Sequence, residues 1–209
     1  MSQVSSSFDD FFLIRDVYSD EVFRGAARDD YRMLEDRTYG QTASAQTPRI
    51  SLEEGCPSNV SDVIWISSIP IVSSAFVTSL REVGATGFRT FGVLVTGRDS
   101  VSVDGYVGLA IYGRCHQLGY DFDNPNIVEI DRPARKVNHY RGKLFDKERW
   151  DGSDIFVEEI KPGPIVIGHR VADQLRRSRL SNFELQPLSE CITPEWDTNV
   201  PLIKLGQRS

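Results

Sequence analysis

Two stretches of this 209-residue sequence place their apolar residues and helix signals in the same order. Each begins with a proline and two β-branched residues, continues with a helical pattern and ends in an apolar run typical of a strand. Leu80 and Leu175 occupy equivalent places in the two helical patterns, 95 positions apart, and the same offset relates Phe88 to Phe183. Any two strand–helix–strand segments share some of this pattern, so chance similarity stays open. A chain organised around two such units is expected to have an α+β fold.

The first of these two helices is the best defined in the sequence. Ser73 or Ser74 can accept hydrogen bonds from free backbone N–H groups at its start, and Gly84 suits its end. Its apolar positions have helical spacing and form one stripe, which consists of Phe76, Val77, Leu80 and Val83. The second helix begins near His169 and has Val171, Ala172 and Leu175 on one face.

Alternating or continuous apolar runs predict the other elements. We expect strands over 11–18, 64–66, 69–72, 88–95, 106–112, 127–130, 155–160 and 183–188, a short helix over 22–27, and an irregular excursion over 38–59. The predicted core is Trp65, Ile71, Phe76, Leu80, Phe88, Val93, Leu109, Ile111, Phe156, Ile165, Val171, Leu175 and Phe183. The expected fold is therefore α+β: a single domain over 1–209, with an antiparallel or mixed sheet and two similar strand–helix–strand units.

Composition and cysteine use indicate a soluble cytoplasmic protein. The first twelve residues contain Asp9 and Asp10 where a secretory signal needs basic residues followed by an apolar run. The most apolar window, 63–76, contains four serines and a proline, so no membrane span is expected. Cys56, Cys115 and Cys191 are odd in number and far apart, which favours reduced thiols over a disulfide framework.

Charge is distributed in two blocks of opposite sign, although the net charge is −6. Nine acidic residues and four arginines lie between Asp9 and Asp36, whereas seven basic and two acidic residues lie between Arg132 and Arg149. The basic stretch, which we expect to be loop with some strand, also contains Tyr140, Phe145 and Trp150. It is the one candidate for nucleic-acid binding. The acidic pI of about 5.1 makes such binding unlikely, because phosphate contacts need a basic face.

Known catalytic and metal-binding motifs do not occur in the sequence. Neither a phosphate-binding glycine loop nor a GxSxG nucleophile turn is present, and no histidine or cysteine spacing fits a metal site. Cys115 and His116 are adjacent in the sequence, and neighbours on a strand point to opposite faces and could not meet there, whereas a pair of Cys115 with His139 stays open. Asp121 and Asp123 are better explained by an Asx turn than by a calcium loop. We expect no cofactor and no metal.

The order of these segments resembles the myxobacterial-type immunity proteins of bacterial polymorphic toxin systems. The resemblance extends over about 64–188 and is carried by Ile71 to Leu80 with Gly84 and Gly87-Phe88, then by Tyr106 to Tyr112, Ile155-Phe156-Val157 and Ile165 to Leu175. It implies a protein without catalytic residues that neutralises a toxin by binding it.

The expected function is therefore that of a non-enzymatic immunity protein, with a cognate toxin as its partner. The candidate contact residues are acidic and aromatic, and they are Asp9, Asp10, Tyr18, Asp29, Asp30, Tyr31, Asp121, Phe122 and Asp123. Two alternatives stay open: a binding or scaffolding module unrelated to toxins, and a hydrolase or transferase that uses Cys115 or an acidic residue. Oligomeric state does not follow from the sequence.

Overall fold

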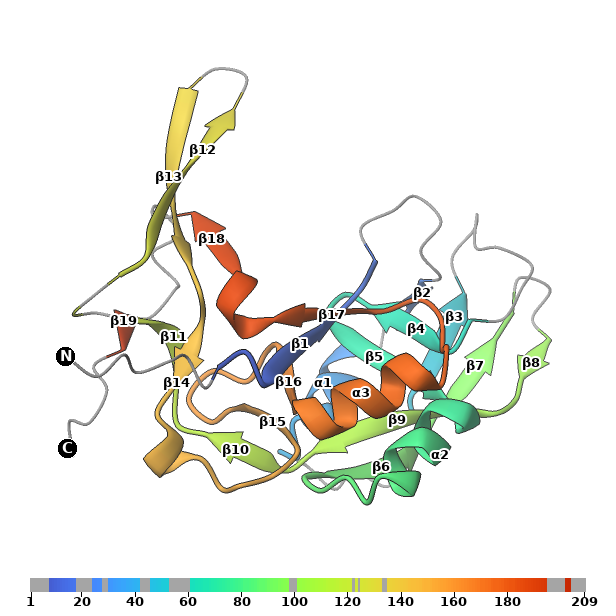
Figure 1. The fold of residues 1–209 in the computed structure, drawn as a ribbon. Helices are drawn as coiled ribbons and strands as arrows, with labels where there is room; N and C mark the ends of the chain where they lie inside the picture. The colour runs from blue at the N-terminus through green and yellow to red at the C-terminus, as the bar shows by residue number, and fades with distance from the viewer. Residues whose placement is uncertain are drawn as a thin grey trace.

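The structure is a computed structural model that describes residues 8–17, 24–27, 30–41, 46–52, 61–97, 101–121, 123, 125–132, 135–194 and 202–203. Within these residues the chain forms five sheets and three short α-helices. Figure 1 shows the sheets gathered into one body from which a long hairpin projects.

Two sheets build the centre of the body, and both are mainly antiparallel. The first has the strand order β10(Gly113–Cys115), β15(Ile155–Glu158), β16(Ile165–Gly168), β1(Phe11–Arg15) and β17(Glu184–Pro187). The second has the order β4(Val63–Ile66), β5(Ile69–Ser73), β9(Tyr106–Ile111) and β6(Phe88–Gly92).

Three smaller sheets surround this centre. One contains β2(Gly25–Ala26), β3(Arg49–Leu52), β7(Leu94–Thr96) and β8(Ser102–Val103). Another contains β14(Leu144–Phe145), β11(Leu118–Asp121) and β19(Leu202–Ile203). The last consists of the hairpin strands and a short third strand, in the order β12(Ile127–Arg132), β13(Arg135–Arg141) and β18(Ile192–Pro194).

The helices are α1(Tyr31–Thr38), α2(Ser74–Glu82) and α3(His169–Arg177), with 3₁₀ turns η1(Lys147–Arg149) and η2(Leu188–Glu190). The start of α2 confirms the predicted cap, because the Ser73 hydroxyl accepts a hydrogen bond from the Phe76 N–H at 3.2 Å. Helices α2 and α3 pack together, and the hydroxyls of Ser79 and Ser178 are 2.8 Å apart across their contact. No helix in the described part of the chain is long and apolar enough to cross a membrane.

The expected α+β class is wrong, because the described residues are mostly β. Many strands are only two to four residues long, too short to produce a recognisable alternation in the sequence. The fold is also not a clear pair of strand–helix–strand units. β9 lies between β5 and β6, and β1 lies between β16 and β17, so neither helix connects two paired strands. Strands from outside the expected units complete both central sheets.

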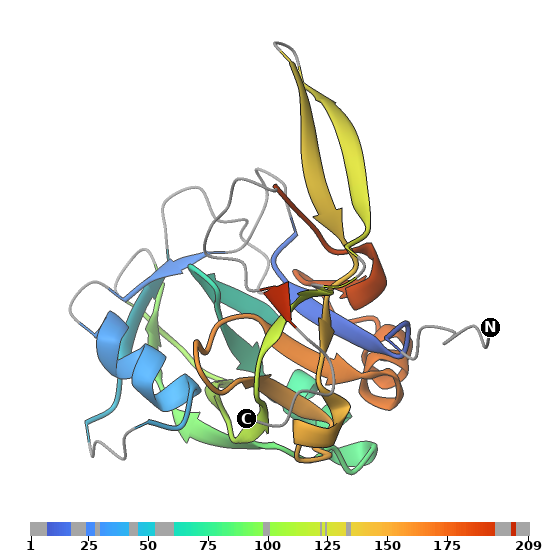
Figure 2. The same cartoon turned by 90° about the vertical axis from the view of Figure 1, so that its left-hand side faces the viewer.

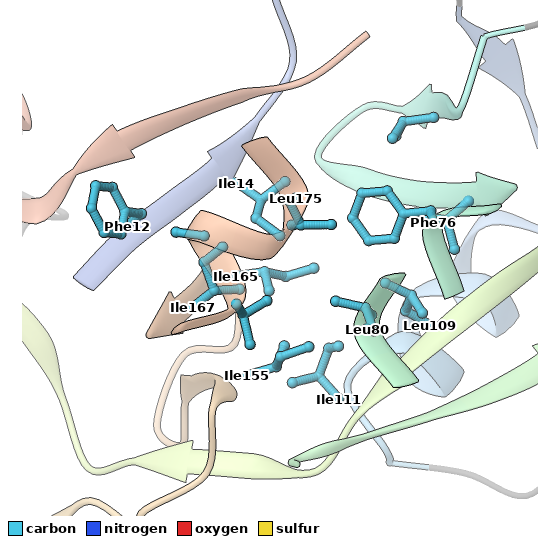
Figure 3. Close-up of a cluster of buried hydrophobic side chains, with 14 of the residues drawn as sticks. Phe12, Ile14, Phe76, Leu80, Leu109, Ile111, Ile155, Ile165, Ile167 and Leu175 are labelled. Carbon is cyan, nitrogen blue, oxygen red and sulfur yellow. The ribbon is translucent and has the colours of Figure 1, made fainter. Parts of the chain in front are cut away.

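The main core cluster lies between the two central sheets and helices α2 and α3, as Figure 3 shows. It joins apolar residues that are far apart in the sequence, among them Phe12, Phe76, Leu109, Ile155 and Leu175. Ten of the thirteen predicted core residues are buried, which confirms most of the prediction. The other three, Phe88, Val93 and Phe183, are partly buried and pack against core clusters.

A charged junction fastens α3 to the end of α2. The Asp154 carboxylate accepts hydrogen bonds from the Arg170 guanidinium at 2.8 and 2.9 Å and from the Thr86 N–H and hydroxyl at 2.9 and 2.8 Å. Burial raises the pKa of Asp154, but the bonds from Arg170 and Thr86 outweigh it and hold the pKa below its ordinary value of 3.8. The ionised carboxylate therefore stabilises the folded state.

We expect Asp154→Asn to lower the free energy of unfolding at pH 7 by about 1–2 kcal/mol, since it removes the charge that Arg170 and Thr86 contact. Because the pKa of Asp154 is lower in the folded state, the ionised carboxylate stabilises the protein fully above the unfolded-state pKa of 3.8. This stabilisation is lost as pH falls through the folded-state pKa. Urea unfolding at several pH values measures the gap in the free energy of unfolding between wild type and Asp154→Asn. A gap that stays constant below pH 3.8 contradicts this role for the ionised carboxylate.

Candidate partner-binding surface

The hairpin formed by β12 and β13 is the part of the described chain that departs most from the body. Figure 1 shows its two strands extending away from the central sheets, and Figure 2, turned by 90°, shows the same projection. Six directly opposite residue pairs join the strands, from Ile127 with Tyr140 at the base to Arg132 with Arg135 at the far end. A regular antiparallel ladder therefore carries the hairpin outward.

The base of the hairpin presents apolar side chains to solvent on both faces of its sheet. Residues directly opposite in an antiparallel pair share a face, and successive residues alternate between faces. Ile127 shares one face with Tyr140, whereas Ile192 shares the other face with Arg141. Ile127 is 47% exposed and Ile192 is 44% exposed. Apolar side chains of similar exposure also occur elsewhere on the described surface, as at Leu94 and Ile160, and such side chains can serve as anchors for a partner protein.

Contacts with β11 and β18 anchor the base of the hairpin to the body. The Tyr120 side chain is buried, its ring lies 5.4 Å from the Tyr140 ring, and its hydroxyl donates to the Thr193 hydroxyl oxygen at 2.7 Å. His139 is buried beside them, with Nδ1 2.9 Å from the Val137 carbonyl oxygen. The base is therefore held in place by packing, and the projecting strands extend from a fixed support.

A hollow of about 280 Å³ opens at this base. Residues from five separate parts of the chain line it: the segment before β1, the end of β11, the start of β12, the end of β13 with the turn that follows, and η2. Its polar and aromatic lining consists of Phe8, Asp121, Asn126, Arg141, Lys143 and Ser189. The hollow and the exposed isoleucines together are named here the hairpin-base surface.

Local backbone geometry brings the basic side chains into the hollow. Gly142 has a φ of +87°, a conformation that favours glycine, and it turns the chain between Arg141 and Lys143. The Gly142 N–H donates to the Cys191 carbonyl and the Lys143 N–H donates to the Leu188 carbonyl, at 2.9 and 2.7 Å. These bonds hold the turn against the segment that contains η2.

Phe8, which lines the hollow, belongs to an aromatic cluster that holds it in place. The rings of Phe8 and Phe11 contact the ring of Phe145 edge to face, with centroids 5.4 and 5.0 Å apart. The Lys147 ammonium lies 4.9 Å from the centre of the Phe8 ring. Edge-to-face rings and a cation over a ring face are both favourable contacts, so this wall is well supported.

The cations of the basic stretch have different surroundings in the structure. Lys136 forms an ion pair with Glu129 on the opposite strand at 2.6 Å. Lys147 lies over aromatic rings. Arg141 and Lys143 have no side-chain hydrogen bond or ion pair with any described residue. Among the described residues, these two cations of the hollow therefore have no direct anionic partner.

The described cysteines are unsuited to nucleophilic chemistry. Burial, with a further contribution from Glu158, raises the pKa of the Cys115 thiol to about 12. Burial also raises the pKa of Cys191 to about 11. Both thiols are protonated at neutral pH, whereas the thiolate is the nucleophile. His116, next to Cys115, is partly exposed and lies 3.7 Å from Glu159, so it belongs to the surface.

The predicted contact residues do not form one face. Asp9 and Asp10 are exposed and directly follow Phe8 of the hollow. Asp121 ends β11 and lines the hollow, and the Asp123 N–H donates to its carboxylate at 2.9 Å, which confirms the predicted Asx turn. These four acidic residues therefore belong to the neighbourhood of the hairpin base.

The remaining predicted residues lie elsewhere. Asp30 precedes α1, and its carboxylate accepts a hydrogen bond from the Arg49 N–H at 2.7 Å, which fastens α1 to β3. Tyr31 is partly buried and packs against the second core cluster beside β3 and β4. Figure 2 shows α1 at the left of the body, away from the projecting hairpin at the top. Tyr18, Asp29 and Phe122 lie outside the described residues.

The aromatic residues of the basic stretch are occupied in packing. Phe145 is fully buried, Trp150 packs against the same aromatic cluster, and Tyr140 contacts Tyr120. Rings packed in this way are not available to stack on bases, which weakens the nucleic-acid alternative.

Sequence reasoning noticed the basic run but missed the hollow. Arg141 and Lys143 belong to that run, so charge was the available signal for them. Phe8 and Ser189 join them only through tertiary packing, and no local pattern marks them. No protein-family model matches this sequence, and no curated protein is significantly similar to it.

Proposed function

We propose that this chain is a non-enzymatic immunity protein that acts in the bacterial cytoplasm, where it binds a cognate toxin through the hairpin-base surface and neutralises it. The observation that carries the proposal is the projecting hairpin, which is anchored at its base, where the three-stranded sheet exposes Ile127 of β12 on one face and Ile192 of β18 on the other. The sequence resemblance to immunity proteins of polymorphic toxin systems supplies the toxin as the class of partner.

A projecting hairpin is suited to inhibit a toxin by inserting into a cleft of that toxin. A two-stranded ribbon that enters a cleft contacts both walls, and this requires binding groups on both of its faces. Ile127 on β12 and Ile192 on the adjoining β18 provide such groups at the base, while Glu129, Lys136 and Asn138 provide polar groups farther out on the two hairpin strands. Apolar anchors supply most of the affinity in many interfaces, and surrounding charges favour the correct partner.

The chemistry of the described nucleophiles supports binding over catalysis. Cys115 and Cys191 are buried and protonated, and His139 is buried in the support of the hairpin. Asp9, Asp10, Asp121 and Asp123 remain candidate toxin contacts at the rim of the hairpin-base surface. Asp30 and Tyr31 are less suited to that role, since α1 packs against the second core cluster, away from the projecting hairpin.

The proposal predicts rescue of cells that express the toxin. The product of the gene adjacent to this one is expressed alone and together with this chain, and survival is measured. Co-expression should restore growth, and the two purified proteins should elute as a one-to-one complex in size-exclusion chromatography. Growth arrest that persists despite co-expression, with no complex with any neighbouring gene product, would contradict the immunity function. A complex without rescue would favour a binding or scaffolding module.

The surface itself is tested by placing a charge on the hairpin. We expect Ile127→Asp to weaken the toxin complex by at least about tenfold, because a carboxylate replaces an apolar contact. Ile160→Asp is the matched control, since Ile160 is 61% exposed in the loop after β15. Calorimetric titration measures both affinities. Equal losses in the two variants, or no loss in either, would show that the toxin binds elsewhere.

A further inference from the structure

We propose that the hollow at the hairpin base receives a glutamate or aspartate side chain of the protein partner, held between the Arg141 guanidinium and the Lys143 ammonium. This inference rests on the proposed function, because it assigns a chemical class to one contact of the hairpin-base surface. The juxtaposition that carries it is a hollow of about 280 Å³ with two cationic side chains and one carboxylate, Asp121, in its lining.

Arg141 and Lys143 differ from the other cations of the basic stretch in the contacts that their side chains make. Elsewhere on the hairpin, Lys136 is paired with Glu129, and beside its base Lys147 lies over two aromatic rings. Arg141 and Lys143 form no side-chain hydrogen bond or ion pair in the part of the chain that the structure describes, although the Lys143 ammonium partly offsets the burial that raises the pKa of the Glu158 carboxyl. Arg141 is exposed and Lys143 is half-buried, so water solvates both cations in the free protein.

A bound partner would also change the solvation free energy of the Arg141 and Lys143 cations. A protein that binds the hairpin-base surface removes water from both cations, and an unpaired buried charge is strongly unfavourable. A carboxylate from the partner offsets this unfavourable free energy. It can accept hydrogen bonds from both the Arg141 guanidinium and the Lys143 ammonium, and its pairing with a guanidinium can be bidentate. The partner is therefore expected to bring an acidic side chain to this point.

The size and lining of the hollow suit an acidic side chain. A volume of about 280 Å³ accommodates one or two side chains, and Phe8 offers an apolar wall for their methylene groups. The Ser189 hydroxyl and the Asn126 amide can bind a neighbouring backbone group. A nucleic-acid ligand is disfavoured, because the nearby aromatic rings are packed away and the chain carries a net charge of −6.

The test uses blocked hexaglutamate as the probe and the full chain labelled with ¹⁵N. Hexaglutamine, inorganic phosphate and hexathymidylate are titrated in parallel, and the amide signals of Gly142, Lys143 and Ser189 are followed by NMR. Hexaglutamate should shift these signals saturably and hexaglutamine should not. The variant Arg141→Ala/Lys143→Ala should weaken hexaglutamate binding by about tenfold or more, because it removes two charge-assisted contacts.

The control is Arg81→Ala/Arg177→Ala, which removes the same charge from exposed positions on α2 and α3. Its affinity for hexaglutamate should change by less than about twofold, because distant surface charges are screened at physiological salt. Equal weakening in both double variants would overturn the proposal, as would a tighter response to phosphate or hexathymidylate at the same signals. The titration needs no toxin, so a failed rescue with hexaglutamate binding intact would refute the immunity function alone.

Discussion

Replacing Leu80 by alanine is expected to lower the free energy of unfolding by about 2–5 kcal/mol. Leu80 is fully buried in the main core cluster, on the face of α2 that meets α3 and the central sheets. Figure 3 shows its side chain close to those of Leu109 and Ile111. The alanine loses the transfer free energy of the leucine methyl groups and leaves a cavity that rigid neighbours fill only in part.

Chemical unfolding followed by circular dichroism measures this loss as a shift of the transition midpoint. Leu94→Ala is the matched control, because Leu94 is 50% exposed on β7, and its free energy of unfolding should change by no more than about 0.5 kcal/mol. Similar values for the two variants would mean that the α2 contact contributes little to the core.

Elements with strong local signals were predictable from the sequence. Helix α2 has a serine cap, an apolar stripe and a terminal glycine, and each of these depends only on residues within one short segment. Helix α1 has none of these advantages. It lacks a side-chain cap and buries only Leu34 and Thr38, so its sequence gives little periodic signal. No helix was expected over these residues from the sequence.

Strands that depend on distant partners were not predictable in the same way. β3 lies within the segment expected to be irregular, yet Ile50 in it is fully buried and the strand pairs with β7, far along the chain. The helix expected over 22–27 is also wrong in its described part, where Gly25–Ala26 pairs with β3. A Cβ on Gly25 would lie 2.8 Å from the Ile66 side chain, so this glycine permits close packing.

The candidate site shows the same division between local and distant signals. The apolar run that begins at Ile127 predicted β12, and some strand was expected in the basic stretch, but its composition did not indicate that 135–141 forms the longest described strand. The predicted α+β class failed for a related reason, since short strands acquire their partners only in the folded chain. Acidic residues that looked like one block in the sequence, such as Asp10 and Asp30, separate in space because β1 and α1 pack on different clusters.

The backbone of Gly87 lies against β15 of one central sheet and against the point where β9 of the other passes into β10. Gly87 has a φ of +88°, and a Cβ built on it would lie 2.1 Å from the Ile155 carbonyl oxygen at the start of β15. Its own carbonyl accepts hydrogen bonds from the N–H groups of Tyr112 and Gly113 at 2.8 and 3.0 Å, where β9 passes into β10. No flexible side chain can move to relieve such a clash, because the obstructing atom belongs to the backbone of a buried strand.

Gly87→Ala is therefore expected to lower the free energy of unfolding by about 3–5 kcal/mol, or to prevent folding, since backbone strain and steric overlap add together. Gly84→Ala separates the two effects. Gly84 has a φ of +62°, but a Cβ there would have no atom within 4 Å, so only the strain of about 1–2 kcal/mol applies. Thermal and urea unfolding of the two variants, with soluble yield as a further readout for Gly87→Ala, measure the difference. If Gly87→Ala and Gly84→Ala lower the free energy of unfolding by the same amount, the sheets can separate locally without loss of stability, and the close approach at Gly87 does not constrain the fold.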